Sequence, residues 1–183
     1  MSILLEKDII LSEKENDFFT YIQGNDFPWY YNHYNLRAND DNKPFTSGNI
    51  LYTHMCMKRN SENKNIRGDI NSHHLFFSEQ FFMRVCKEND ISVDTIFRVG
   101  FNSTFYRPDK HDIFHNDHLF KHKIFIFYIN DFDNGSTFIK NDKEEITEIK
   151  AKKNKAIIFD GCLHAQGFCD LYQRRLILIV TFI

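Results

Sequence analysis

The second half of the chain is a series of short apolar segments separated by turn residues, and this pattern constrains the fold more than any other feature. Phe occurs 20 times in the 183 residues, and aromatic side chains suit the pleated, half-buried surface of a strand. Short strands with regular turn signals are typical of an antiparallel sandwich or barrel, not of a parallel sheet with crossover helices. The expected strands are 95–106, 123–130, 136–140, 145–150, 155–161 and 174–183.

The first half contains helical signals. Ser12 followed by Glu15 is a capping-box pattern, which predicts a helix that runs to about Gln23 and stops at Gly24. A second helix is expected over 79–89, with Ser78 as its cap. Helices early in the chain and strands later predict a mostly β fold with N-terminal helices packed on one face of an antiparallel core.

Extended segments and long polar stretches fill the rest of the first half. The aromatic segment 27–31 and the apolar segment 50–57 are expected to be extended or strand-like. The polar stretches 35–49 and 58–72 are predicted to be surface loops. Loops of this length are often lids or binding loops, so we expect at least one of them to be mobile and to border the cleft.

A chain of this length suits a single domain. We expect residues 1–183 to form one unit, in which 1–93 supply a helical and loop buttress with a lid and 94–183 form the β core. Four cysteines without a Cys-x-x-Cys pair do not indicate a disulfide framework.

Charge and hydropathy exclude several classes of function. The formal net charge is −2 and the chain has no basic stripe, so a nucleic-acid partner is not expected. No run of 18 apolar residues is present, which argues against a membrane span or a membrane partner. The first residues lack the long apolar region of a signal peptide, and we therefore expect a cytoplasmic protein.

Three residues of the second half are candidate metal ligands. His115 and Asp117 are two residues apart, and on a strand such residues point to the same face. His164, the only histidine after His122, could add a third ligand from a distant strand. Two histidines and one carboxylate suit Fe(II) and leave coordination positions open. A His-x-Asp pair alone is a weak signal, since it can equally be two surface residues.

The C-terminal strand begins with two arginines. An arginine that faces into a barrel requires an anion, because a buried unpaired charge is costly. A dicarboxylate would supply one and bind the guanidinium through two hydrogen bonds. Arg174 and Arg175 are adjacent, so their side chains point to opposite faces of a strand and only one can enter the barrel.

The chain resembles the Fe(II)/2-oxoglutarate-dependent oxygenases in the order and spacing of three features. These are the His-x-Asp pair, a histidine about 49 residues further and an arginine about ten residues beyond that histidine. The likeness is greater to the prolyl 4-hydroxylase-like branch, including its small phage and marine-bacterial members. Segment 127–130 with Gly135 and Thr137 is similar to a strand and turn of this family, and 154–167 is similar to the stretch around its distal histidine. The likeness covers about residues 96–183.

This resemblance implies a double-stranded β-helix, that is, a cupin-like jelly roll. It implies that His115, Asp117 and His164 bind Fe(II), with 2-oxoglutarate and O₂ as cosubstrates and ascorbate as a stimulant. The implied reaction hydroxylates a substrate, with release of succinate and CO₂, and the first candidate substrate is a peptidyl prolyl residue.

The resemblance also implies how the far carboxylate of 2-oxoglutarate is held. Tyr128 matches the tyrosine that contacts this carboxylate in such hydroxylases. Ten residues after the distal histidine is the commoner offset for its arginine, and the spacing from Arg174 to Phe182 matches the end of the family's strand. We therefore expect Arg174 to bind the C5 carboxylate, with Arg175 as the alternative.

Other functions remain compatible with the sequence. Members with collagen-type activity have lysine where this chain has arginine, so the match does not define the substrate. The same chemistry could act on a small molecule or on an alkylated nucleobase. A non-catalytic cupin-like module that binds a metal or ligand, and a structural protein in which His-x-Asp is accidental, are alternatives from other classes.

Several other side chains near the motif could contribute. His111 and His118 are alternative ligands, although the odd spacing of His118 from His115 points it to the other face. Cys162 could be a nucleophile with a histidine base, but no third group that would orient them is evident. The strand expected to line the pocket has three more candidates for contact with 2-oxoglutarate or substrate, which could equally be core or rim residues: Arg98, Asn102 and Tyr106.

Overall fold

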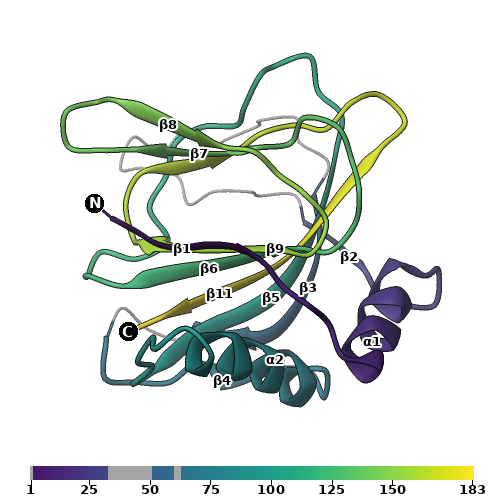
Figure 1. Ribbon diagram of the computed structural model, residues 1–183, viewed down its shortest axis with the longest axis vertical. Coiled ribbons are helices and arrows are strands. Elements are labelled where there is room, and N and C mark those ends of the chain that lie inside the picture. The colour runs from purple at the N-terminus through teal and green to yellow at the C-terminus, as the bar shows by residue number, and fades with distance from the viewer. Residues whose placement is uncertain (1, 33–50, 60–62) are drawn as a thin grey trace.

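The computed structural model describes residues 2–32, 51–59 and 63–183, and in these residues two antiparallel sheets and two helices form three layers (Figure 1). The mostly β fold with N-terminal helices is therefore confirmed. The large sheet contains β1 (Ile3–Asp8), β2 (Tyr30–Asn32), β3 (Leu51–Lys58), β4 (Asp69–Ile70), β5 (Ile96–Phe105), β6 (Lys123–Tyr128), β9 (Lys155–Asp160) and β11 (Arg174–Phe182). The small sheet contains β7 (Thr137–Lys140), β8 (Ile146–Ile149) and β10 (His164–Gln166), and the helices are α1 (Glu13–Gln23) and α2 (Leu75–Lys87).

The two sheets have different positions in the fold. The large sheet has the order β1-β9-β6-β11-β5-β3-β2, with β4 beside β3, and the small sheet has the order β10-β7-β8. In Figure 1 the small sheet lies above the large one, and the helices lie against the opposite face of the large sheet. The described part of the N-terminal half thus supplies four strands of the large sheet in addition to helices.

Strand β11 lies in the middle of the large sheet and is buried on both faces. Leu176, Leu178 and Val180 pack in the core on the side of the helices. Ile177 and Ile179 pack in a second core between the two sheets. Because side chains alternate along a strand, the odd-numbered positions of β11 face the space between the sheets.

Helix α1 confirms the capping box. The Ser12 hydroxyl accepts from the Glu15 backbone N–H at 3.4 Å, and a Glu15 carboxylate oxygen accepts from the Ser12 N–H at 2.8 Å. The helix is capped at its other end by Gly24, as expected.

The predicted start of the second helix is wrong. Helix α2 begins at Leu75 rather than after Ser78, and its N-cap is His74. Ser78 lies inside the helix, where its hydroxyl donates to the His74 carbonyl oxygen at 2.8 Å. A serine that bonds back to the preceding turn is compatible with a helix interior, so this residue type did not mark the boundary.

The cap of α1 provides a stability prediction. Ser12→Ala removes the acceptor for the Glu15 N–H and is expected to lower the free energy of unfolding by about 1 kcal/mol. Urea titration followed by circular dichroism measures the change. Ser12→Thr retains the hydroxyl and serves as the control; equal stability of the alanine variant and the parent would show that the cap does not contribute.

The remaining segments differ from expectation in particular places. Each strand expected in the second half is present with ends shifted by a few residues, and β3 corresponds to the expected strand 50–57. The sequence did not indicate β1 or β10. The stretch 35–49 lies outside the described residues, while 58–72 includes β4, and the mobility of a lid stays a prediction. Neither described helix has the length and apolar character needed to cross a membrane.

Candidate active site

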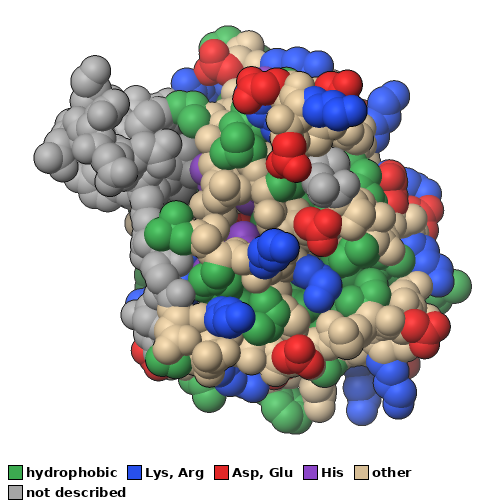
Figure 2. Space-filling view, turned by 90° about the vertical axis from the view of Figure 1, so that its left-hand side faces the viewer, with side chains coloured by type: hydrophobic (Ala, Val, Ile, Leu, Met, Phe, Trp, Pro, Cys, Tyr) green, Lys and Arg blue, Asp and Glu red, His purple; other side chains and the backbone are tan. Residues whose placement is uncertain are grey.

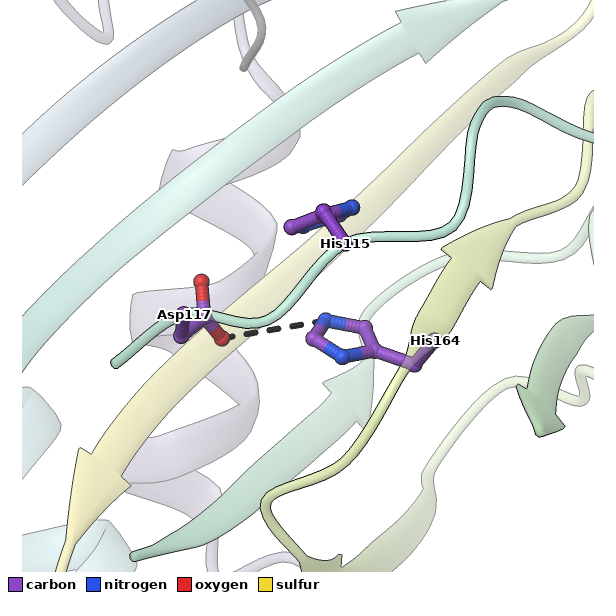
Figure 3. A group of neighbouring side chains, drawn as sticks. All are labelled: His115, Asp117 and His164. Atoms are coloured by element: carbon purple, nitrogen blue, oxygen red, sulfur yellow. Dashed lines mark ion pairs between the residues drawn. The ribbon is translucent and has the colours of Figure 1, made fainter. Parts of the chain in front are cut away.

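The two histidines and the aspartate singled out from the sequence lie together between the two sheets. One ligand atom from each of His115, Asp117 and His164 lies within 4.8 Å of the others (Figure 3). His164 begins β10 of the small sheet, and the other two residues lie in the segment between β5 and β6. This segment brings His115 and Asp117 next to His164, although His164 lies 47 or more residues further along the sequence.

Backbone pairing positions the two imidazoles. The N–H of His115 donates to the carbonyl oxygen of His164, and the N–H of His164 donates to that of His115, both at 3.0 Å. The ring centroids lie 4.5 Å apart. The segment with His115 and Asp117 is not the regular strand on which the spacing argument rests, because it makes only isolated bridges, at His111 and at His115. Their side chains converge nevertheless.

The carboxylate of Asp117 is buried, with 7% of its side chain exposed. Its Oδ1 accepts from Nη1 of Arg98 at 3.2 Å, and its Oδ2 lies 3.7 Å from Nε2 of His164. Burial alone would raise the pKa of Asp117, but the nearby charges of His164, which is protonated in the acid range where Asp117 titrates, and of Arg98 outweigh it and hold the pKa well below its usual range. Asp117 is therefore ionised at neutral pH.

His164 is neutral at neutral pH, since its burial lowers its pKa to about 4. Its Nδ1 lies 2.9 Å from the carbonyl oxygen of Cys162. A carbonyl oxygen can only accept, so Nδ1 carries the proton and Nε2 presents its lone pair toward Asp117. This is the form in which histidine binds a metal.

These residues fit a divalent metal ion of the iron type. Two imidazoles and one carboxylate are the donor set of mononuclear Fe(II) sites that keep open coordination positions. Among the described residues, no hydrogen-bond donor reaches the buried Oδ2 of Asp117. A buried carboxylate oxygen without a partner is costly, and a bound cation would satisfy it.

The alternative ligands point elsewhere. His118 is buried, and its Nε2 lies 2.8 Å from Oγ1 of Thr181 while its Nδ1 lies 2.9 Å from Nη1 of Arg59. His111 pairs through Nδ1 with the carbonyl oxygen of Asp112. Arg59 follows β3 in the stretch expected to form a lid and also donates to the carbonyl oxygen of Asp117, so this stretch reaches the site.

The arginine that enters the space between the sheets is Arg175, and the prediction that Arg174 does so is wrong. Arg174 points to the helix side, where its Nη2 donates to the carbonyl oxygen of Gln23 at 2.6 Å. Arg175 is 1% exposed. The alternation of β11 therefore differs by one residue from the spacing of the resembling family.

Arg175 lies in a polar pocket, and one of its nitrogens has no hydrogen-bond partner among the described residues. Its Nε donates to the carbonyl oxygen of Gly135 at 2.8 Å, and its Nη2 donates to Oγ1 of Thr137 at 3.3 Å. The guanidinium lies 5.5 Å from the ring centre of Tyr128, whose hydroxyl lies 2.7 Å from the same Thr137 oxygen. Nη1 is buried and has no partner in the described part of the chain. A buried guanidinium in this state requires an anion.

The neighbouring strand β5 extends this pocket. Thr104 is the direct register partner of Arg175, so its side chain points to the same side. The Thr104 hydroxyl and Oδ1 of Asn102 are both buried without a hydrogen-bond partner among the described residues. Sequence reasoning missed Thr104, although its place two residues beyond Asn102 puts it on the same face. Tyr106 lies directly after the end of β5 and is 44% exposed.

No protein-family model matches the chain, and no curated protein matches it. Solved structures do. An oxidoreductase of the 2-oxoglutarate–Fe(II) oxygenase family from Burkholderia pseudomallei superposes with a TM-score of 0.64 at 11% identity, over 93% of this chain and 78% of the other. The chain has the fold of this oxygenase family.

Two further structures have the same fold. The 2-oxoglutarate complex of a viral collagen prolyl hydroxylase from Paramecium Bursaria Chlorella virus-1 gives a TM-score of 0.54 at 15% identity, over 98% of this chain and 96% of the other. A prolyl-4-hydroxylase from Pseudomonas putida gives 0.52 at 12% identity, over 97% and 91%. At these identities the likeness concerns the oxygenase fold.

The surroundings of Cys162 do not favour a nucleophilic thiol. Burial raises the pKa of its thiol to about 11, so the thiol is protonated at neutral pH and weakly reactive. Its carbonyl oxygen instead orients His164. Figure 2 shows histidine side chains that lie recessed on one side of the molecule.

Proposed function

We propose that the chain is an Fe(II)- and 2-oxoglutarate-dependent oxygenase of the prolyl 4-hydroxylase-like branch, with its two sheets arranged as a double-stranded β-helix, or jelly roll. One observation carries the proposal: a two-histidine, one-carboxylate triad shares the space between the sheets with a buried arginine that lacks an acidic partner among the described residues. The triad suits Fe(II), and the arginine suits a dicarboxylate.

The triad supplies the proposed metal ligands, and neighbouring groups orient two of them. His115, Asp117 and His164 are the proposed ligands of Fe(II), which when bound supplies O₂ activation coupled to the breakdown of 2-oxoglutarate into succinate and CO₂. Cys162 fixes the tautomer of His164 through its carbonyl oxygen. Arg98 engages one oxygen of Asp117 and leaves the other toward the triad.

The second part of the site is the proposed subsite for the C5 carboxylate of 2-oxoglutarate. Nη1 of Arg175 is available to donate, and the hydroxyls of Tyr128 and Thr137 lie beside it. Burial raises the pKa of Tyr128, so its phenol keeps its proton and can also donate. The apolar core between the sheets, which includes Ile177 and Ile179, excludes water from this region.

The proposed substrate is a prolyl residue of a peptide. The fold is shared with a prolyl-4-hydroxylase and with a viral collagen prolyl hydroxylase, and the sequence resemblance is greatest to that branch. Hydroxylation of a small molecule or of an alkylated nucleobase by the same residues is the alternative to be tested against it.

Turnover of 2-oxoglutarate tests the proposed chemistry. The protein incubated with Fe(II), ascorbate, O₂ and 2-oxoglutarate is expected to form succinate slowly even without substrate, and faster when a prolyl peptide is added. Succinate is measured by mass spectrometry, with Asp117→Ala as the control. A protein that binds Mn(II) and 2-oxoglutarate but forms no more succinate than this control would be a binding module, and the proposed activity would be wrong.

A further inference from the structure

We propose that the substrate presents a carboxylate to Arg98, beside the metal triad. This inference rests on the proposed function and narrows its substrate to a molecule with an acidic group close to the reacting carbon. A free amino acid and a peptide with a C-terminal proline both meet this description, whereas a proline in the interior of a neutral peptide does not.

The position of Arg98 places its guanidinium at the triad. Arg98 lies on β5 with the same alternation as Asn102 and Thr104, so its side chain points between the sheets. Its Nη1 lies 3.2 Å from Oδ1 of Asp117, and a quarter of the side chain is exposed. An acidic group that reaches Arg98 from solvent would therefore lie next to the proposed metal ligands.

Most of the hydrogen-bonding capacity of Arg98 is unused. Asp117 is its one hydrogen-bond partner in the described part of the chain, and it takes only Nη1. Nε is buried with no partner among these residues. The edge formed by Nε and the remaining amino group carries two parallel N–H donors, which is the geometry that matches a carboxylate.

A structural arginine of the same chain shows the contrast. Arg84 donates from Nε and Nη2 to the carboxylate of Glu15 and from Nη1 to Glu88. All three of its nitrogens have acidic partners. Arg98 has only one such bond, although it is similarly buried, so the ion pair with Asp117 does not account for the whole guanidinium.

Charge balance at the loaded site leads to the same conclusion. The two positive charges of bound Fe(II) would be matched by Asp117 and by the C1 carboxylate of 2-oxoglutarate, and the C5 carboxylate would be matched by Arg175. Arg98 would then be left without a counter-charge, although three quarters of its side chain is buried, and an unmatched charge is costly where it is largely removed from water. The buried Asp112 accepts from the Ile113 N–H and from the side chain of Gln166.

Matched acids and amides test the inference directly. The protein loaded with Mn(II) and 2-oxoglutarate under nitrogen is titrated by calorimetry with each free L-amino acid and its primary amide, and with acetyl-glycyl-proline and its amide. At least one acid is expected to bind about tenfold or more tightly than its amide, as is typical of a charge-assisted pair. In Arg98→Gln this ratio is expected to fall to near one.

The ratio of acid affinity to amide affinity distinguishes recognition of a carboxylate by Arg98 from support of the metal ligand Asp117 by the same side chain. Loss of the contact with Asp117 weakens acid and amide alike, whereas loss of a carboxylate partner lowers the binding of the acid only. Arg67→Gln is the control, because Arg67 also pairs with a carboxylate, that of Glu79, but is half exposed and lies outside the site. The control is expected to keep the parent ratio.

Two results would overturn the inference. One is that no acid binds more tightly than its amide, and the other is that the preference persists unchanged in Arg98→Gln. Both are read in protein that has bound Mn(II) and 2-oxoglutarate. Failure to bind these two would count against the proposed function instead, so the two failures are distinguishable.

Discussion

Stable metal binding is expected to be lost when Asp117 or His164 is replaced by alanine. Each change removes one of three ligands, and Asp117→Ala also removes the negative charge that the cation requires. Loss of a group that merely supports a ligand typically costs 10- to 100-fold in metal affinity, so loss of a ligand should cost more than about 100-fold. Calorimetric titration with Mn(II) under nitrogen measures the affinity of each variant.

His118→Ala is the matched control for the metal site. His118 lies one residue from Asp117 and is buried, but its two nitrogens contact Thr181 and Arg59. Its loss is expected to leave Mn(II) affinity within about threefold, on the scale where 1.4 kcal/mol is tenfold. Circular dichroism establishes that each variant is folded. An unchanged affinity in His164→Ala would disprove the triad.

The second large effect concerns 2-oxoglutarate. Arg175→Gln is expected to lower the affinity of the Mn(II)-loaded protein for 2-oxoglutarate by roughly 30- to 5,000-fold, because removing one partner of a buried charge pair costs about 2–5 kcal/mol. Glutamine retains a polar group near the carbonyl of Gly135 and limits damage to the fold. Calorimetry with 2-oxoglutarate, after metal content has been checked, gives the affinity.

Arg174→Gln is the neighbouring control. Arg174 faces the helices and bonds to the carbonyl oxygen of Gln23, so its loss is expected to change the affinity for 2-oxoglutarate by less than about threefold. If Arg174→Gln were the damaging variant, the side chain that holds the cosubstrate would not be the one between the sheets. If neither mattered, the C5 carboxylate would bind elsewhere.

The residue types and spacing, together with the resemblance to a known family, were sufficient to select the three residues that the structure brings together. His115, Asp117 and His164 could be named from the sequence because the weak His-x-Asp signal is followed by a distal histidine and an arginine at the spacing of the resembling family. The first helix could also be placed, since Ser12 and Glu15 form a local device that needs no tertiary contact. The β-rich second half followed from the lengths of its apolar segments.

Only the tertiary structure decided which side chains meet. Alternation of apolar and polar residues identifies the inward face of a strand when the other face is exposed to solvent. Strand β11 is buried on both faces, so its sequence is an almost continuous apolar run. Its sequence therefore could not distinguish Arg174 from Arg175. The contact of Arg98 with Asp117 depends on the path of the segment between β5 and β6. The position of Thr104 beside Arg175 depends on the pairing of β5 with β11, which are distant in sequence. The local sequence does not predict such contacts, because they arise from strand register and packing across the whole fold.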